Sequence, residues 1–291
     1  MKLTASIVTY KTPHDELGEC ISALKRDGTA RIYIIDNSPD ESLRDFISTL
    51  PANDIVEYIA RHDNPGYGTA HNMALRRALE ENTQYHLVIN SDVYFEDGTL
   101  PKIIEYMDLH PDTGMLQPRI ISPDGSEQFS SRLIPSPFDL IGRRFMPGFL
   151  NTTRNRRYLL TERPKGVALN IPYHQGSFMF FRVEILRKSG LFDERFFMYP
   201  EDIDISRRIH ALCPTIYWPE VTVTHAHRAS SYHSIKMLRI HMVNMFRYFN
   251  KWGWILDPER KYFNKRILRQ ISDIRKKGQR IFPVGKQWLQ E

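Results

Sequence analysis

The sequence predicts an α/β fold in which a mainly parallel central sheet is flanked by helices and followed by a helical C-terminal extension. Short β-rich runs alternate with helical patterns over about the first 122 residues, as is typical of parallel strands joined by crossover helices. With 291 residues, 41% of them hydrophobic, the chain can bury one large core. The positive charge is concentrated near the C-terminus, which distinguishes the extension from the rest.

In the first half of the chain, residues 1 to about 122, strands and helices are expected to alternate. Strands are expected at Leu3–Tyr10, Arg31–Asp36, Ile55–Ala60, Tyr85–Ile89 and Met115–Ile121, and helices at Asp15–Lys25, Gly68–Glu81 and Leu100–Leu109. Polar residues end three of these strands: Thr9-Tyr10, Asp36 and Asn90-Ser91-Asp92. Ligands of parallel sheets lie beyond the carboxyl ends of the strands, so we expect these residues to converge on one crevice.

The second half begins with an irregular stretch, residues 133–172, that is rich in proline and contains a basic run at Arg154, Arg156 and Arg157. After it we expect a strand, a helix, a pair of short strands and a long helical region. Their bounds are Tyr173–Phe181, Glu201–Ala211, Ile216–Trp218 with Val221–Thr224, and Ser231 to about Lys277, with breaks near Gly253 and Asp257-Pro258. We therefore divide the chain into a main domain, residues 1–228, and an extension, residues 229–291.

Composition excludes several classes of protein. Only Cys20 and Cys213 are present, so neither a disulfide framework nor a zinc cluster is indicated, and a reducing, cytoplasmic setting is the simpler interpretation. The N-terminus reads as a first strand instead of a signal peptide, and no run of about 18 apolar residues suggests a membrane span. Residues 228–291 carry 15 Lys and Arg against 4 Asp and Glu, a net charge of +11, which leaves −5 for residues 1–227.

The extension has two interpretations. An apolar stripe at helical spacing runs along its first helix: Ile235, Leu238, Met242, Met245, Phe246 and Phe249. The helix could pack on the main domain and leave a solvated basic face. It could instead meet anionic lipid as a peripheral contact, where each basic residue is worth about 1 kcal/mol.

Candidate binding residues follow from the polar strand ends. Asp36 can accept hydrogen bonds from a base or ribose, or it can form an Asx turn. The segment "NPGYGTAHN", residues 64–72, makes a tight loop before a helix, where backbone N–H groups can approach a phosphate or nucleoside. It matches neither a dinucleotide nor a Walker motif. Asp92 can offer carboxylate oxygen to a cation bound to a diphosphate, or it can cap a turn.

Further candidates lie in "FFMYPEDIDISRRI", residues 196–209, and at the end of a later strand. Glu201, Asp202 and Asp204 form either an acidic first turn that complements the helix dipole, or a cluster that raises the proton affinity of a general base. His225 ends its strand facing the same way as His227. A strand-end histidine is commonly structural, but His225 or His227 could complete a metal site with Asp92.

Taken in order and at their intervals, these motifs resemble family 2 of the glycosyltransferases, which have the GT-A fold. The resemblance rests on "SIVTY", "IIDNS", "NPGYGTAHN", "VINSDV", "GSFMFFRVEILRKSGLFDERFFMYPEDIDISRRI" and "VTHAHRASS", and covers roughly residues 3–255. Its most specific part is GLFDERFFMYPEDIDISRR. The segment "YFNKWGW" is similar to bacterial enzymes of O-antigen and capsule assembly, many of them rhamnosyltransferases.

The resemblance implies a role for each motif. It makes residues 1–228 a GT-A catalytic domain, residues 1–122 its nucleotide-binding half and residues 133–172 an acceptor-side loop. Asp36 is placed on the nucleotide base, and the implied donor-binding residues are Thr9, Tyr10, Asp36, Asn64, Gly66, Gly68, Asn72, Asn90, Ser91 and Asp92.

Asp92 becomes the metal-binding acid of a DXD-type motif, for Mg²⁺ or Mn²⁺, with His225 near the metal. Asp202 becomes the catalytic base, and the implied sugar and acceptor pocket is Gln175, Gly176, Ser177 and Glu201. Asn90 departs from the motif because it stands where the first acid is usual.

The expected activity is inverting transfer of a sugar, L-rhamnose from dTDP-rhamnose first, to a hydroxyl of a glycan or lipid-linked acceptor in bacterial surface polysaccharide synthesis. We expect no nucleic-acid partner, and a cytoplasmic location or a peripheral one at the inner face of the plasma membrane. The alternatives are a sugar nucleotidyltransferase and a non-catalytic nucleotide-sugar-binding protein. The first would need a glycine-rich, basic phosphate loop near the first strand, for which "VTYKTPHDE" is a poor match.

Overall fold

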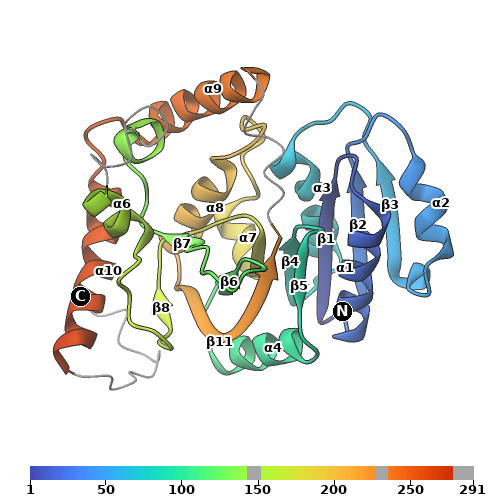
Figure 1. Cartoon of the computed structure of the whole chain (residues 1–291), viewed down its shortest axis with the longest axis horizontal. Helices are drawn as coiled ribbons and strands as arrows, with labels where there is room; N and C mark the ends of the chain where they lie inside the picture. The colour runs from blue at the N-terminus through green and yellow to red at the C-terminus, as the bar shows by residue number, and fades with distance from the viewer. Residues whose placement is uncertain (143–151, 227–234, 278–291) are drawn as a thin grey trace.

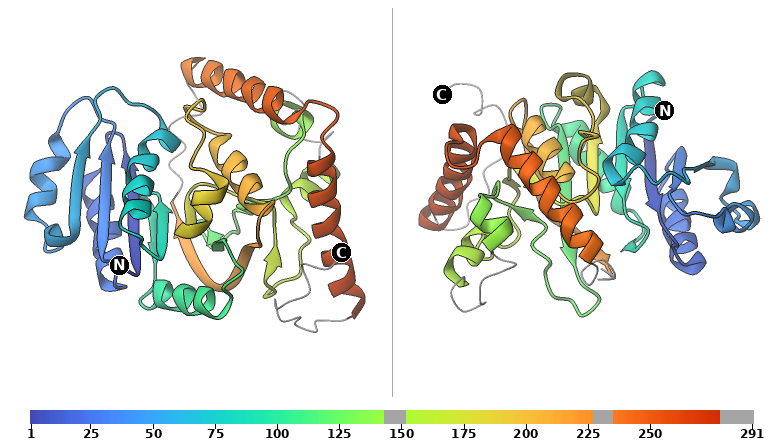
Figure 2. Two further views of the ribbon diagram at one scale, coloured as in Figure 1. Left: turned by 180° about the vertical axis from the view of Figure 1, so that it is seen from behind. Right: turned by 90° about the horizontal axis from the view of Figure 1, so that it is seen from above.

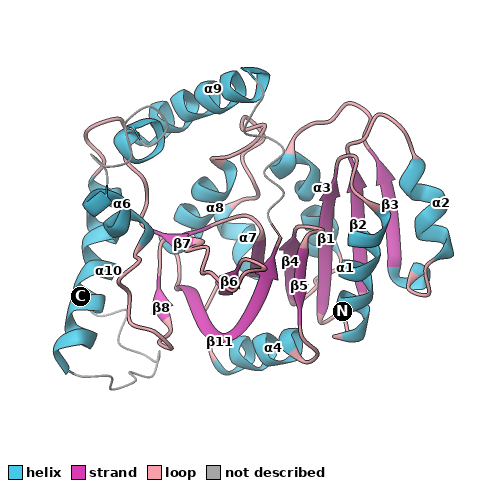
Figure 3. Ribbon diagram, viewed as in Figure 1, coloured by secondary structure: helices cyan, strands magenta, loops and turns pink. Residues whose placement is uncertain are grey.

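The computed structural model describes residues 1–142, 152–226 and 235–277. Its centre is a nine-stranded sheet with the order β3-β2-β1-β4-β10-β6-β11-β5, to which β8 is added by pairing with β11 (Figures 1 and 3). The strands are β1 Leu3–Thr9, β2 Arg31–Asp36, β3 Val56–Ala60, β4 Tyr85–Ile89, β5 Val93–Phe95, β6 Met115–Ile121, β8 Leu169–Asn170, β10 Phe178–Arg182 and β11 Thr215–His225. A second sheet pairs β7, Ser131–Arg132, with β9, Tyr173–His174.

The strand directions confirm the expected α/β fold with a mainly parallel sheet. Strands β1, β2, β3, β4, β6 and β11 run the same way, and β5, β8 and β10 run against them. In the parallel register Thr9 is opposite Asp36, so the polar ends of β1 and β2 lie side by side, as the sequence predicts.

Helices cover both faces of the sheet. They are α1 His14–Arg26, α2 Ser42–Thr49, α3 Tyr67–Glu80, α4 Thr99–Leu109, α6 Thr152–Leu159, α7 Val183–Ser189, α8 Glu201–His210, α9 Ile235–Trp252 and α10 Pro258–Lys277, with a 3₁₀ turn at Asn53–Ile55 and a π-helical turn at Phe138–Gly142. The largest core cluster joins one sheet face to α1, α2 and α4. A second cluster joins the other face to α3, α7 and α8.

The helical extension packs on the main domain. Helices α9 and α10 lie on the side of the molecule away from β1, β2 and β3 (Figures 1 and 2). Tyr248 and Phe249 of α9 are buried against Phe196 and Ile203. This part of the apolar stripe therefore packs on the main domain and does not face lipid. The expected start at Ser231 and the boundary at residues 228–229 lie outside the described residues. None of the helices in the described part of the chain is long and apolar enough to cross a membrane.

Three expected elements are corrected by the structure. The expected strand Tyr173–Phe181 is two strands, because Gln175-Gly176-Ser177 turns the chain from β9 into β10, which pairs antiparallel with β4 and β6. The expected pair Ile216–Trp218 and Val221–Thr224 is one bent strand, β11, with a register shift between Trp218 and Thr222. Residues 133–172, expected to be irregular, contain α6 and β8.

Candidate active site

The ends of β1 and β2 form one side of the site. The Asp36 carboxylate, 1% exposed, accepts hydrogen bonds from Thr9 Oγ1 at 3.0 Å, the Ser38 amide at 3.0 Å and the Tyr58 hydroxyl at 2.8 Å. Tyr10, the residue after Thr9, is exposed. Three donors therefore fix the Asp36 carboxylate in place. Its bond with the Ser38 amide is that of an Asx turn, and a hydrogen bond from Asp36 to a base or ribose stays a prediction.

The ends of β4 and β11 form the opposite side. The chain leaves β4 through Asn90-Ser91-Asp92 and enters β5, which pairs with the end of β11 so that Val93 is opposite His225. This pairing brings Asp92 Oδ1 to 3.3 Å from His225 Nε2, and it places Asn90 Nδ2 at 3.5 Å from the same nitrogen. Ser91 turns away and donates to Glu16 at 2.6 Å, which fixes the trio to α1. The second histidine, His227, lies outside the described residues.

The Asp92–His225 pair fits a divalent cation by its chemistry. A carboxylate oxygen and an imidazole nitrogen suit Mn²⁺, and two neighbouring ligands of an octahedral ion with bonds of about 2.1 Å lie about 3 Å apart. The observed 3.3 Å is close to that separation. In the described ranges no three or more His, Cys, Asp or Glu side chains gather around one point.

Tyr67 of α3 lies between the Asp92–His225 pair and Asp202, the expected base. Its hydroxyl lies 2.7 Å from the Gly176 carbonyl oxygen and 3.1 Å from Asn90 Oδ1. Burial, and then the negative charges of Glu201, Asp202 and Asp92, raise the pKa of Tyr67 well above its ordinary value. Tyr67 contacts Asn90 and Gly176, and the Gly176 amide donates to Asp202, so the β4 end and the start of α8 lie side by side.

Asp202 is held at the start of α8 by three donors. One oxygen accepts from the Gly176 amide at 3.0 Å and the Tyr173 hydroxyl at 3.3 Å, and the other accepts from the Ile203 amide at 2.7 Å. Burial raises the pKa of Asp202, while these backbone bonds and the positive charge of Arg132 oppose the increase. Donors that stabilise the charged form make Asp202 the member of the acidic pair that carries the negative charge.

Glu201, the other acid of the pair, has different surroundings. Burial raises its pKa and the charge of Asp202 raises it further, while backbone N–H groups of Glu201 and Tyr199 oppose the increase. Its Oε2 atom is buried and has no hydrogen-bond partner within the described residues, and the same is true of Ser177 Oγ beside Gly176. Buried polar atoms are nearly always paired in proteins, so these two atoms mark places where a substrate hydroxyl could bind.

The expected acceptor pocket is built around Gly176. A side-chain carbon added there would lie 3.3 Å from the Tyr67 ring, which is a tight contact, and 3.6 Å from Asp202 Cβ, which is an ordinary one. The neighbouring Gln175 is fixed by Arg132, which donates to its Oε1 at 3.2 Å. The structure thus brings together Gln175, Gly176, Ser177 and the acidic pair.

The glycine-containing loop, residues 64–72, packs on the segment that leads into α8. A carbon added at Gly66 would lie 2.3 Å from the Phe197 carbonyl oxygen, and Gly68 has a similar close approach to Phe192. The Tyr67 amide donates to Phe197 O at 3.0 Å. The place of Asn64, Gly66 and Gly68 near the nucleoside stays a prediction, but these contacts explain the glycines by packing.

Asn72 is held by the segment before α8. It is 1% exposed, and its amide donates to Phe192 O at 2.9 Å while accepting from Phe192 N at 3.0 Å. A second bond to Glu194 at 3.0 Å completes the contacts. Asn72 therefore joins α3 to the segment before α8, and its role as a donor contact stays a prediction.

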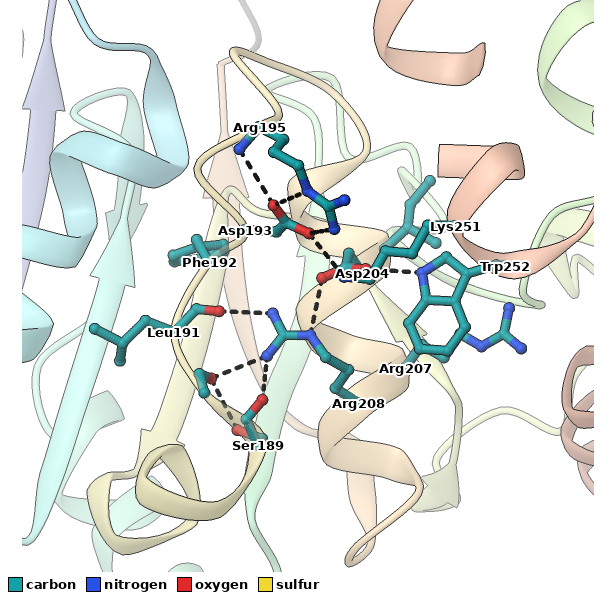
Figure 4. A network of polar contacts seen from close by, with 12 residues as sticks. Ser189, Leu191, Phe192, Asp193, Arg195, Asp204, Arg207, Arg208, Lys251 and Trp252 are labelled. Atoms are coloured by element: carbon teal, nitrogen blue, oxygen red, sulfur yellow. Dashed lines mark hydrogen bonds and ion pairs between the residues drawn. The ribbon is translucent and has the colours of Figure 1, made fainter. Parts of the chain in front are cut away.

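Asp204, the third acid of the cluster, is structural (Figure 4). Its carboxylate is fully buried and bonds to Arg208 at 2.8 Å, Lys251 at 2.6 Å and the Trp252 indole at 2.7 Å. Asp193 joins the same network through Lys251 at 2.8 Å. The network fixes α9 to α8 and leaves Glu201 and Asp202 as the acids of the site.

Sequence reasoning missed Tyr58, Tyr67, Gln128, Arg132 and Tyr173. Tyr67 lies inside the segment NPGYGTAHN but had no role assigned to it, and the other four lie in none of the quoted motifs. Each of the five acts through a partner distant in the sequence. A groove of about 740 Å³ lies elsewhere, between α1 and β5, and no residue named above as a site residue lines it. We place the active site by the convergence of polar groups and not by that groove.

Comparison with known proteins shows that the chain is a glycosyltransferase. The profile of glycosyl transferase family 2 matches residues 4–190, and the chain belongs to that family. It is 30% identical over 241 residues to the N-acetylglucosaminyl-diphospho-decaprenol L-rhamnosyltransferase of Mycobacterium tuberculosis, a match that covers 77% of this chain and 75% of that protein. It is 28% identical over 209 residues to the low-salt glycan biosynthesis hexosyltransferase Agl10 of Haloferax volcanii, covering 71% of this chain and 61% of that protein.

Solved structures show the same fold. GalNAc-T7 with UDP, GalNAc and Mn²⁺ superposes with a TM-score of 0.58 at 15% identity, covering 95% of this chain and 57% of that one. The mannosyltransferase PcManGT from Pyrobaculum calidifontis, in complex with GDP-Man and Mn²⁺, has a TM-score of 0.54 at 15% identity, covering 96% of this chain and 76% of that one. These likenesses confirm the expected GT-A fold, and the family match confirms the expected family.

Proposed function

We propose that the protein is an inverting, metal-dependent glycosyltransferase that moves a sugar from a nucleotide-diphosphate donor to a hydroxyl of a lipid-linked or glycan acceptor in surface polysaccharide synthesis. The observation that carries the proposal is the arrangement around Tyr67, which has the Asp92–His225 pair on one side and Asp202 on the other. The first donor we propose is dTDP-L-rhamnose, supported by the mycobacterial L-rhamnosyltransferase relative.

Asp202 is the proposed general base. Its carboxylate is oriented by the Gly176 and Ile203 amides, and burial brings its pKa toward neutrality, where a base both ionises and accepts protons efficiently. It would take the proton from the acceptor hydroxyl as that oxygen attacks the anomeric carbon opposite the leaving diphosphate. Attack on the opposite face inverts the configuration and involves an oxocarbenium-like transition state.

The donor is proposed to lie between the β1–β2 end and the β4–β11 end. Asp36 and Thr9 would meet the nucleoside, with Tyr10 exposed at the rim, and Asp92 with His225 would hold the metal at the diphosphate. Mg²⁺ or Mn²⁺ bound there would neutralise the charge that develops on the leaving phosphates. Asn90 replaces an acid with a neutral oxygen, so it contributes a dipole in place of a charge.

The acceptor is proposed to enter over Gly176. Ser177 Oγ and Glu201 Oε2 are buried polar atoms that a sugar hydroxyl could satisfy, and Gln175, which Arg132 holds, is two residues before Ser177. Residues 133–172 remain the proposed acceptor side of the catalytic domain, residues 1–228. A lipid-linked acceptor agrees with the diphospho-decaprenol acceptor that the mycobacterial relative's name gives.

A single substitution tests the proposal. Asp202→Asn keeps the size of the side chain and removes the base, so we expect kcat to fall about 10²-fold or more while dTDP-sugar affinity is retained. Turnover and product stereochemistry are measured by NMR with dTDP-rhamnose and a GlcNAc-diphospho-lipid acceptor.

Asp273→Asn on the exposed face of α10 is the matched control and should leave turnover unchanged. Turnover near normal in Asp202→Asn would refute the assignment of the base. Absence of transfer and of donor hydrolysis by the wild-type protein across a panel of nucleotide sugars would favour a non-catalytic binder, and formation of a nucleotide sugar from a sugar phosphate would favour a nucleotidyltransferase.

A further inference from the structure

Gln128 contacts His225 at two points. Its Oε1 atom lies 2.9 Å from His225 Nδ1, and its Nε2 atom donates to the His225 carbonyl oxygen at 2.7 Å. Gln128 thus binds both the ring and the backbone of the same residue. No sequence motif pointed to this residue, because it lies 97 positions away along the chain.

The second contact fixes the orientation of the Gln128 amide. A carbonyl oxygen can only accept, so the NH₂ group must face the His225 carbonyl, and it also reaches Ser122 Oγ at 3.1 Å. The amide oxygen then faces Nδ1 of the ring and can only accept as well. The proton of a neutral His225 ring is therefore placed on Nδ1, which leaves the lone pair on Nε2, the atom that faces Asp92 at 3.3 Å.

A tight turn after β6 places Gln128 beside His225. Asp124 Oδ1 accepts from the Ser126 amide at 2.9 Å, Gly125 has φ 82°, and the Gln128 amide donates to Ile120 O at 3.0 Å. The next residue, Phe129, has φ 46°, an unfavourable conformation for a bulky side chain. The turn and the backbone geometry hold the Gln128 side chain against His225.

We propose that Gln128 is a positioning residue for the metal site: it holds His225 in the Nδ1-protonated tautomer, so that Nε2 is offered as a ligand beside Asp92. This inference rests on the proposed function, which supplies the divalent cation. Residues that hydrogen-bond the non-coordinating nitrogen of a histidine ligand typically contribute 10- to 100-fold to metal affinity.

The tautomer is measured first, without metal. Nitrogen NMR of histidine-labelled protein at about pH 8.5, above the usual histidine pKa of about 6.5, distinguishes protonated from unprotonated ring nitrogens. His225→Ala assigns the signal. We expect His225 to carry its proton on Nδ1 in the wild type, and Gln128→Ala to shift the population toward the Nε2-protonated form. A wild-type ring protonated on Nε2 would overturn the inference.

Metal binding is measured next, by the electron paramagnetic resonance of free Mn²⁺ in the presence of dTDP. We expect Gln128→Ala to weaken Mn²⁺ binding about tenfold. Gln128→Glu, which retains an acceptor for Nδ1–H, should recover most of the affinity. In a His225→Ala background the Gln128→Ala change should have no further effect, since the two residues act as one unit.

The controls separate this inference from the proposed function. Gln84→Ala removes the same side chain at the opposite end of β4 and should leave Mn²⁺ binding unchanged, and Asp92→Ala should abolish it. Equal Mn²⁺ affinity in wild type and Gln128→Ala would refute the role of Gln128 and leave the glycosyltransferase proposal intact. Wild-type protein that binds dTDP but no Mn²⁺ would refute both the metal site and the positioning role of Gln128, while sugar transfer would still be decided by the Asp202 assay.

Discussion

Glu201 and Asp202 are adjacent in sequence, yet their surroundings differ. Asp202 accepts from two backbone amides and a phenol, whereas Glu201 Oε2 is buried without a partner in the described chain. Differences of this kind separate the pKa values of neighbouring carboxyl groups and allow one to stay protonated while the other is ionised. We infer that Glu201 holds the proton of the pair in the free enzyme.

This inference predicts how stability depends on pH. The folded protein holds the Glu201 proton more tightly than the unfolded chain, so the contribution of Glu201 to stability is present below about pH 4.5 and is lost as pH rises to about 8. Glu201→Gln cannot ionise, so the free energy of unfolding should fall less steeply with pH over that window. Denaturant melts at several pH values measure the slope.

An exposed carboxyl group provides the control. Glu105→Gln on the surface of α4 should leave the slope unchanged. A Glu201→Gln slope equal to that of the wild type would mean that Glu201 is already ionised at neutral pH in the folded protein.

For single residues, the sequence indicates which residue types gather in a motif, and the contacts of each side chain need the fold. The acidic cluster was visible in "YPEDID", but the separation of Asp204 from the other two depends on Arg208, Lys251 and Trp252, which reach it through tertiary packing. Asn72 was assigned to the donor because of its motif, and only the fold shows that the backbone of Phe192 occupies its amide.

Among the elements, α8 is joined to the C-terminal helices by a buried ion pair. Arg207 donates to both oxygens of Asp257, at 2.7 and 2.5 Å, and the side chains of the two residues are 2% exposed. Asp257 also caps α10, because its carboxylate accepts from the Arg260 amide at 2.9 Å and Pro258 follows it. One residue therefore starts α10 and ties it to the helix that carries the acids of the site.

Removing this carboxylate should be costly. We expect Asp257→Ala to lower the free energy of unfolding by about 3–5 kcal/mol, since it leaves Arg207 buried without its main partner. Asp257→Asn keeps the cap and removes the charge, so its loss isolates the ion pair from the cap. Urea unfolding followed by circular dichroism measures both.

The surface pair Glu41–Arg44 offers a contrast, and Glu41→Ala should have little effect. A small effect of Asp257→Ala would show that Glu259, which also contacts Arg207, compensates for the lost carboxylate.

Elements with local signals were predicted well, and elements defined by distant partners were not. The break at Asp257-Pro258 follows from the proline, and the helices α1, α3, α4 and α8 follow from apolar spacing. Strands β9 and β10 could not be separated in the sequence, because their partners, β7 on one side and β4 with β6 on the other, determine where each strand ends.

Over the whole molecule, two apolar side chains stand out at the corner between α9 and α10. Ile255 and Leu256 are 88% and 87% exposed, and Phe246 is 49% exposed nearby on α9. Lys261 on α10 is also exposed and adds positive charge near this corner. We propose that this corner, not the buried stripe of α9, makes the peripheral contact with anionic lipid that a lipid-linked acceptor would require.

Vesicle binding tests this surface. We expect the wild type to co-sediment with anionic vesicles at low salt, and Ile255→Asp with Leu256→Asp to reduce the bound fraction several-fold, because both changes place charge where apolar side chains would enter the interface. Leu109→Asp, at an exposed apolar position on α4, is the matched control and should bind as the wild type does. Equal binding of the corner variant would refute the contact.

The pairing of β5 with β11 determines when, during synthesis of the chain, the proposed Asp92–His225 metal pair can form. Strand β5 follows β4 after three residues, yet its partner within the described residues is β11, which is also the last strand that they contain. A ribosome therefore makes Asp92 early and Asp202 later, but His225 and the edge that positions Asp92 arrive only with β11. A nascent chain that has not reached Thr215 lacks the proposed metal pair, so it is not equipped to hydrolyse a sugar donor before it can use one.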